Sequence, residues 1–182
     1  MASRAHTSAS VPDRDDLGLI LNELEQRIQA QEHRVAIADV LYRFGAGQDL
    51  KDRMLFESAF TPTAELDFVQ PARRLGIELP VFKGRDAIVS SIMSTVSQLD
   101  TTHTVTNSRI DLDGRQAALF ALVEALHLPR SDHSRHLLLK NFYWATLLSG
   151  KAGWQIEYLR IENVWMDGDP RVLFPAAASQ IA

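Results

Sequence analysis

The chain has 182 residues, of which 46% are hydrophobic and 23% charged, values that suit one globular domain with a single core. Its formal net charge is −4 and its pI is about 5.8, which argues against a nucleic-acid partner, because phosphate binding relies on clustered Lys and Arg. The absence of cysteine excludes disulfides, thiolate metal sites and thiol nucleophiles.

The N-terminal segment shows no sign of membrane insertion or export. No apolar run reaches the roughly 18–20 residues that a membrane-spanning helix needs. Residues 1–16 are polar and lack the apolar stretch of a secretory signal. We therefore expect a disordered leader over residues 1–16, no membrane association and, by default, a cytoplasmic location.

Helical spacing dominates the first part of the chain. Apolar side chains recur at three- and four-residue steps in two stripes, which predict helices. Gly45 and Gly47 weaken the second helix near Asp49. The stripes consist of Leu17, Ile20, Leu21, Leu24 and Ile28, and of Ile37, Val40, Leu41 and Phe44.

Two more helices and one strand are predicted before residue 100. A short helix over residues 50–59 ends at Thr61-Pro62. A strand-like run follows at 64–69, and a turn at Lys83-Gly84 precedes a helix over residues 84–99. The segment between them, residues 70–80, contains Pro, Arg and Gly and is predicted to be a loop.

The rest of the chain has the composition and alternation of strands. Residues 101–112 are rich in Thr, Val and Ile, and Asp113-Gly114 is a strong hairpin turn before a strand over residues 116–128. Further strands are predicted at residues 136–148 and 154–165. Helices followed by antiparallel strands predict an α+β fold in which helices pack on one face of a curved antiparallel sheet and enclose a pocket.

The two-residue period assigns side chains to faces of these strands. In residues 154–160, Trp154, Tyr158 and Arg160 share one face, where Arg160 would meet either a protein carboxylate or a ligand oxygen. Small side chains on one face of residues 117–127 either leave room for a cavity or let a helix pack closely. That face consists of Ala117, Leu119, Ala121, Val123, Ala125 and His127.

Asp49 and His103 are the candidate chemical groups, each with a structural alternative. Asp49 could close a helix or cap the next one, and His103 could be a structural histidine in a Thr-rich strand. His133 and His136 lie in a loop without a carboxylate on a fixed helix, so we expect no metal site.

Four segments, in this order, resemble those of the SnoaL-like branch of the NTF2-like superfamily. They are IADVLYRFGAGQD, FTPTAELDF, THTVTNSRIDLDG and GWQIEYLRIENVWMDGDP. The resemblance covers residues 17–172 and leaves residues 173–182 as a C-terminal tail. It implies an NTF2-like cone, with N-terminal helices packed on a curved antiparallel sheet that encloses a pocket.

Within this superfamily the chain resembles scytalone dehydratase, hexachlorocyclohexane dehydrochlorinase and bile-acid 7α-dehydratase. Asp49 and His103 match the proton-abstracting dyad of the dehydrochlorinase. The bile-acid enzyme has an Arg in its closing strand, which Arg160 matches, and a Tyr upstream of its Asp, which Tyr42 matches although Phe44 falls at the expected spacing. His127 could partly replace a further carboxylate of that dehydratase.

The resemblance implies a cofactor-independent lyase. His103 would abstract a proton, because a neutral imidazole with a reference pKa of about 6.5 is a suitable base near neutral pH. Asp49 would fix its tautomer, and loss of hydroxide or halide would follow, with Arg160 or Tyr42 polarising a substrate oxygen. The residues expected to contact a small hydrophobic cyclic substrate are Leu66, Phe68, His127, Trp154 and Tyr158.

Other functions exist on the same scaffold. A ketosteroid-isomerase-like isomerase and a polyketide cyclase also begin with proton abstraction, and other members bind ligands or form the small subunit of dioxygenases. The resembled lyases are mostly trimers and other relatives are dimers. We therefore expect a homo-oligomer, with a trimer favoured over a dimer.

Overall fold

The computed structural model describes residues 14–174, which divide into two compact units at His33 and Arg34. The predicted leader and C-terminal tail therefore lie largely outside the described residues. In the first unit, residues 14–33 are helical, and the first apolar stripe is exposed along its whole length. No helix among residues 14–174 is long and apolar enough to span a membrane.

The two helices predicted from the apolar stripes are one element, α1 (Arg14–Asp49). The residues between the stripes are mainly Gln, Glu, Ala and Arg, which favour helix and contain neither Gly nor Pro to end it. The helix ends where Lys51 takes a left-handed φ of 59°. Asp52 then caps α2 (Arg53–Ser58), because its carboxylate accepts a hydrogen bond from the Leu55 backbone N–H.

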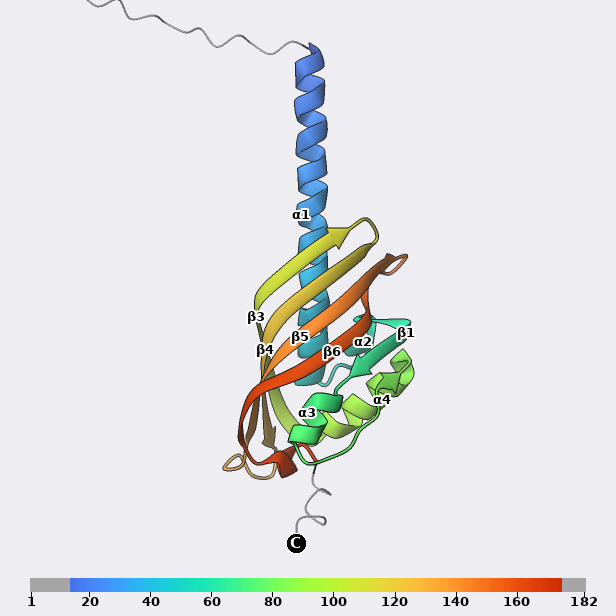
Figure 1. Ribbon diagram of the computed structural model, residues 1–182. Coiled ribbons are helices and arrows are strands. Elements are labelled where there is room, and N and C mark those ends of the chain that lie inside the picture. The colour runs from blue at the N-terminus through green and yellow to red at the C-terminus, as the bar shows by residue number, and fades with distance from the viewer. Residues whose placement is uncertain (1–13, 175–182) are drawn as a thin grey trace, which may run out of the picture. The chain divides into compact units, whose positions relative to one another are not determined.

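The second unit is built on a six-stranded sheet in the order β2-β1-β6-β5-β4-β3 (Figure 1). Its pairs are antiparallel except for β1 and β6, which run parallel, so the expectation of a purely antiparallel sheet is wrong at this pair. The strands are β1 (Phe60–Asp67), β2 (Phe82–Lys83), β3 (Leu99–Asp113), β4 (Gln116–Pro129), β5 (Leu137–Gly150) and β6 (Gly153–Gly168).

The α+β class and the long C-terminal strands are confirmed. The predicted turn at Asp113-Gly114 joins β3 to β4, with Gly114 at a φ of 55°. The predicted helix over residues 84–99 is α4 (Arg85–Val96). The segment predicted to be a loop instead begins with α3 (Val69–Arg74), because Pro71 falls in its first turn, where no backbone N–H is needed.

The main core lies between the inner face of the sheet and the part of α1 from Arg34 onward. The second apolar stripe is buried there, with Ile37 and Val40 fully inaccessible to solvent. Figure 1 shows α3 and α4 at one end of the long curved strands. A smaller cluster at that end includes Leu75, Leu137 and Leu173, which follows η1 (Pro170–Val172).

A β-bulge in β6 changes which residues face the core. Ile156 pairs with Leu147 of β5 and Tyr158 pairs with the preceding Thr146, so Glu157 is an extra residue between them. Trp154 and Ile156 point inward before the bulge, and Leu159 and Ile161 after it. The predicted common face of Trp154, Tyr158 and Arg160 is therefore wrong, because one inserted residue reverses the side-chain alternation.

Two glycines let α1 approach its neighbours closely. A Cβ on Gly45 would lie 2.9 Å from Cβ of His103, and a Cβ on Gly47 would lie 2.5 Å from the backbone nitrogen of Phe56. Both distances are shorter than normal contacts. The two glycines that weaken the helix are thus what allows β3 and α2 to pack against it.

We expect Gly47→Ala to lower the free energy of unfolding by about 1–3 kcal/mol, because rigid backbone has to move to admit the methyl group. The control is Gly18→Ala in the same helix, where nothing lies within 4 Å of the added atom. Urea denaturation of both variants checks this. A Gly47→Ala protein as stable as wild type would show that the approach is not tight.

Candidate active site

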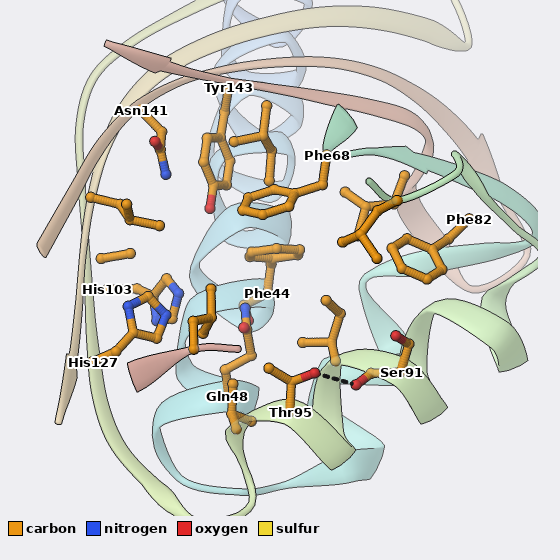
Figure 2. A pocket seen from close by; sticks show the side chains of 18 of the residues that line it. Phe44, Gln48, Phe68, Phe82, Ser91, Thr95, His103, His127, Asn141 and Tyr143 are labelled. Atoms are coloured by element: carbon orange, nitrogen blue, oxygen red, sulfur yellow. Dashed lines mark hydrogen bonds between the residues drawn. The ribbon is translucent and has the colours of Figure 1, made fainter. Parts of the chain in front are cut away.

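One cavity of about 100 Å³ opens between the sheet and the helices, and Figure 2 shows the side chains around it. The inner faces of β3 to β6 form one wall, and the segment from β1 to α4 forms the other. α1 contributes Phe44 and Gln48. The strand wall consists of His103, Ala125, His127, Leu139, Asn141, Tyr143 and Ile161.

Asp49 and His103, 54 positions apart in the chain, meet at the end of α1. Nδ1 of His103 lies 2.7 Å from Oδ1 of Asp49, and the His103 backbone N–H donates to Oδ2 at 2.8 Å. The imidazole is 4% exposed and the carboxylate side chain 22% exposed. An ionised carboxylate only accepts hydrogen bonds, so Nδ1 of His103 is the donor in this contact, and Nε2 is the ring nitrogen that Asp49 does not bind.

Further hydrogen bonds hold the Asp49 carboxylate in place. The Thr101 hydroxyl donates to Oδ1 at 2.9 Å, and Lys51 Nζ donates to the same hydroxyl oxygen at 3.1 Å. Burial raises the pKa of Asp49, but the hydrogen bonds and charge of His103, with help from Thr101, outweigh it and leave the pKa below its usual value. Asp49 is therefore ionised at neutral pH.

A second histidine, His127, lies beside the first. Its ring centroid is 6.0 Å from that of His103, and its Nδ1 is 3.3 Å from the Leu137 carbonyl oxygen. Burial, and secondarily repulsion from His103, lowers the pKa of His127 to about 3. His127 is thus neutral at physiological pH and adds a polar but uncharged group to the cavity.

Tyr143 and Asn141 supply the other polar groups of the strand wall (Figure 2). Burial and the nearby Asp49 carboxylate raise the pKa of Tyr143 well above its usual value, and the Asn141 side chain offsets this in part. The hydroxyl therefore stays protonated. Asn141 is itself oriented by Asn163, whose amide nitrogen donates to its side-chain oxygen at 2.9 Å.

An aromatic residue of α1 joins these groups. The Phe44 ring lies edge-on to Tyr143 at 5.7 Å and to His103 at 6.4 Å, measured between ring centroids. Phe44 lines the cavity, whereas Tyr42, the residue proposed from the resemblance, is 52% exposed and does not line it. The 3.6-residue helical period explains the difference, because positions two apart point to different sides of a helix.

Some of the remaining predicted site residues line the cavity and others do not. Leu66, Phe68 and His127, which we expect to contact the substrate, line the cavity. Trp154 is buried in the core but does not line the cavity.

Tyr158 and Arg160 lie on the outer face of the sheet, because they follow the bulge at Glu157. There Arg160 pairs with Glu162 at 2.9 Å, and the Tyr158 hydroxyl donates to Asp67 at 3.3 Å. The predictions of Arg160 and Tyr158 as pocket residues are therefore wrong.

Asn141, Tyr143 and Gln48 also line the cavity and were not predicted from the sequence. In residues 137–147 every second residue faces inward, and Asn141 and Tyr143 are the polar members of an otherwise aliphatic face. That pattern was a usable signal, since buried polar side chains need partners and often mark a site. Among residues 14–174, no group of three His, Asp or Glu side chains could hold a metal ion.

Residues 29–160 match the SnoaL-like domain family, which is most of the chain. The chain belongs to the SnoaL-like family. A relative of this SnoaL-like protein, the terrestric acid biosynthesis cluster protein E of Penicillium crustosum, is 29% identical over 147 residues, which cover 77% of this chain and 88% of the relative.

Solved structures share the NTF2-like fold at low identity. An NTF2-like protein from Novosphingobium aromaticivorans has a TM-score of 0.61 at 19% identity, covering 85% of this chain and 96% of its own. A candidate scytalone dehydratase from the same species has 0.63 at 17%, covering 81% and 89%. A hexachlorocyclohexane dehydrochlorinase, LinA-type3 of Novosphingobium barchaimii, has 0.64 at 18%, covering 78% and 93%.

We expect the neutral, buried His127 to make stability depend on pH. The pKa of His127 is about 3 in the folded chain and about 6.5 in the unfolded chain, so below pH 6.5 the unfolded chain binds a proton that the folded chain does not. This contribution to stability is complete above pH 6.5 and declines toward pH 3, by about 1.4 kcal/mol per pH unit. Urea denaturation of wild type and His127→Gln between pH 4 and 8 tests this, and equal slopes would contradict it.

Proposed function

We propose that this SnoaL-like protein is a cofactor-independent lyase, which removes a proton from carbon and expels a neighbouring leaving group from a small, hydrophobic cyclic molecule. The observation that carries the proposal is the His103–Asp49 contact at the wall of an apolar cavity. A neutral imidazole with one nitrogen fixed by a carboxylate and the other facing a water-poor space is a suitable general base.

In the proposed reaction, Nε2 of His103 takes a proton from the carbon next to a carbonyl group. The electrons of that C–H bond form a C=C bond, and the leaving group on the next carbon departs with its bonding pair. Asp49 stabilises the imidazolium, because its carboxylate accepts a hydrogen bond from the Nδ1–H group of His103. If hydroxide leaves, the imidazolium returns its proton to give water, and if halide leaves, the proton goes to solvent.

Tyr143 is the best placed donor for the substrate carbonyl oxygen. Its raised pKa keeps the hydroxyl protonated, and burial strengthens a hydrogen bond to the negative charge that develops on that oxygen. Figure 2 shows its hydroxyl directed toward the same space as the His103 ring. In this proposal Tyr143 takes the part that the family resemblance suggested for Arg160 or Tyr42.

The cavity favours a small substrate without a net charge. About 100 Å³ is somewhat less than the roughly 150 Å³ of an engineered apolar cavity that binds benzene, so a cyclic substrate would extend through the open side of the cavity. Most of the wall opposite the strands is apolar, including Leu66, Phe68 and Phe82. No Lys or Arg lines the cavity among the described residues, so nothing there would neutralise an anionic substrate.

The names of two proteins of the same fold and of one relative support this class of reaction. Two proteins of the same fold are named as a candidate dehydratase and a dehydrochlorinase, and both names denote eliminations. The relative from Penicillium crustosum is named for a biosynthesis cluster, which suits an enzyme acting on a small organic molecule.

We expect His103→Ala to abolish turnover and Asp49→Asn to reduce kcat by about 100- to 10,000-fold, the usual contribution of general-base catalysis. The assay is a panel of cyclic β-hydroxy and β-halo ketones, with products identified by the mass loss of water or acid. The matched control is a second His–Asp pair on the surface, in which His133 Nε2 lies 2.9 Å from Asp100. His133→Ala and Asp100→Asn should retain full turnover.

The same assay separates the alternatives. A product of unchanged mass that still depends on His103 would assign an isomerase or a cyclase. Turnover that survives both Asp49→Asn and His103→Ala would exclude the dyad. If no substrate of the panel reacts, exchange of its α-hydrogens in D2O, dependent on His103, still reports proton abstraction, and its absence favours a binding protein.

We expect Tyr143→Phe to lower kcat by about 100- to 1,000-fold, because it removes the donor to the developing oxyanion but keeps the packed ring. KM should change much less. Tyr158→Phe and Arg160→Ala, on the outer face of the sheet, are the controls and should leave kcat unchanged. Loss of activity in Arg160→Ala with full activity in Tyr143→Phe would reverse the assignment.

A further inference from the structure

The helical first unit has a heptad pattern that the core does not use. Four of its apolar residues, Leu17, Leu21, Leu24 and Ile28, follow each other at steps of four, three and four, and each is at least 45% exposed. The same spacing continues to Gln31 and to Val35, which is 70% exposed. Steps that alternate between three and four define the a and d positions of a coiled coil.

The residue types at these positions suit two strands. Counting from Leu21 as a, the a positions hold Leu21, Ile28 and Val35, and Leu17 and Leu24 occupy d. β-branched residues at a with Leu at d favour parallel dimers, and Ile28 and Val35 are β-branched. Most of the stability of a helix in a protein comes from packing of its apolar face, so a partner on this exposed stripe would stabilise residues 17–35.

We propose that residues 17–35 pair in parallel with the same segment of a second copy of this chain. The charged residues beside the stripe favour a second copy of the chain as the partner and a parallel orientation of the two helices. Arg27 is at g and Glu32 at the following e position, so in a parallel pair each Arg27 faces Glu32 of the other copy. In an antiparallel pair e faces e and g faces g, which sets Glu25 and Glu32 against each other and Arg27 against its own copy.

A membrane surface is a poorer binding partner for this stripe than a second copy of the chain. Helices that lie in a bilayer interface carry Lys and Arg on their polar face, which anionic headgroups attract. Residues 14–33 contain five acidic and two basic side chains, so such a surface would repel them. The charge pattern therefore fits a second copy of the chain.

The test uses charge reversal in the full chain. Arg27→Glu would set Glu against Glu32 twice in the dimer and weaken self-association about tenfold, as measured by sedimentation equilibrium. The double variant Arg27→Glu, Glu32→Arg should restore it, because the pairs form again with opposite signs. Neither residue belongs to the core of the described structure, so turnover by the candidate site serves as a control for folding.

Direction is tested separately by a disulfide. The chain has no cysteine, so Leu24→Cys introduces a single thiol at a d position, which faces its own copy only in a parallel pair. Rapid oxidation to a covalent dimer supports the proposal. A monomer at 100 µM, a trimer, an assembly unchanged by Arg27→Glu, or failure of the introduced thiols to cross-link would each overturn it.

Discussion

The contact between Asp49 and His103 organises both the fold and the candidate chemistry. The carboxylate accepts hydrogen bonds from the Thr101 hydroxyl, the His103 backbone and the His103 ring, so it joins the end of α1 to the start of β3. A partly buried carboxylate such as Asp49 is costly unless such donors surround it. The bonds that make its burial tolerable are the same bonds that set the direction of the imidazole.

The polar side chains that line the cavity around this contact are uncharged. His127 and Tyr143 are both held neutral by burial, and Asn141 is oriented by Asn163. In the proposed reaction Asp49 therefore stays ionised, and His103 is the protein side chain whose charge changes when it accepts the proton. Low polarity around a single ion pair strengthens it, which favours the imidazolium once the proton has moved.

Local patterns predicted most elements, and the failures have identifiable causes. The alternation in residues 117–127 gave the correct inward face, and residue spacing gave α4. The bulge at Glu157 could not be seen, because an extra residue in a strand leaves the composition unchanged. The parallel pairing of β1 with β6 depends on contacts between distant segments, which the sequence pattern of either strand does not report.

The candidate dyad was predicted from family resemblance, and the polar wall around it was not. Nothing in the spacing of Asp49 and His103 indicates that they meet. Their approach depends on the missing side chain of Gly45, whose effect on helix propensity was noticed and whose packing role was not. Asn141 and Tyr143 share the inward face of β5 with Leu and Ala, so their place in the cavity wall follows only from the alternation of that strand.

The bulge has a consequence for how functional residues are compared within the family. Glu157 is fixed there by the hydroxyls of Thr61 and Thr63 on the neighbouring strand, so the extra residue is anchored. In this chain the arginine of the Tyr-x-Arg-Ile motif therefore lies on the outer face of the sheet. In a strand without the extra residue, the side chain of the same arginine would point inward. An arginine aligned at this position therefore does not share a catalytic role between two members unless both strands have the same number of residues before the motif.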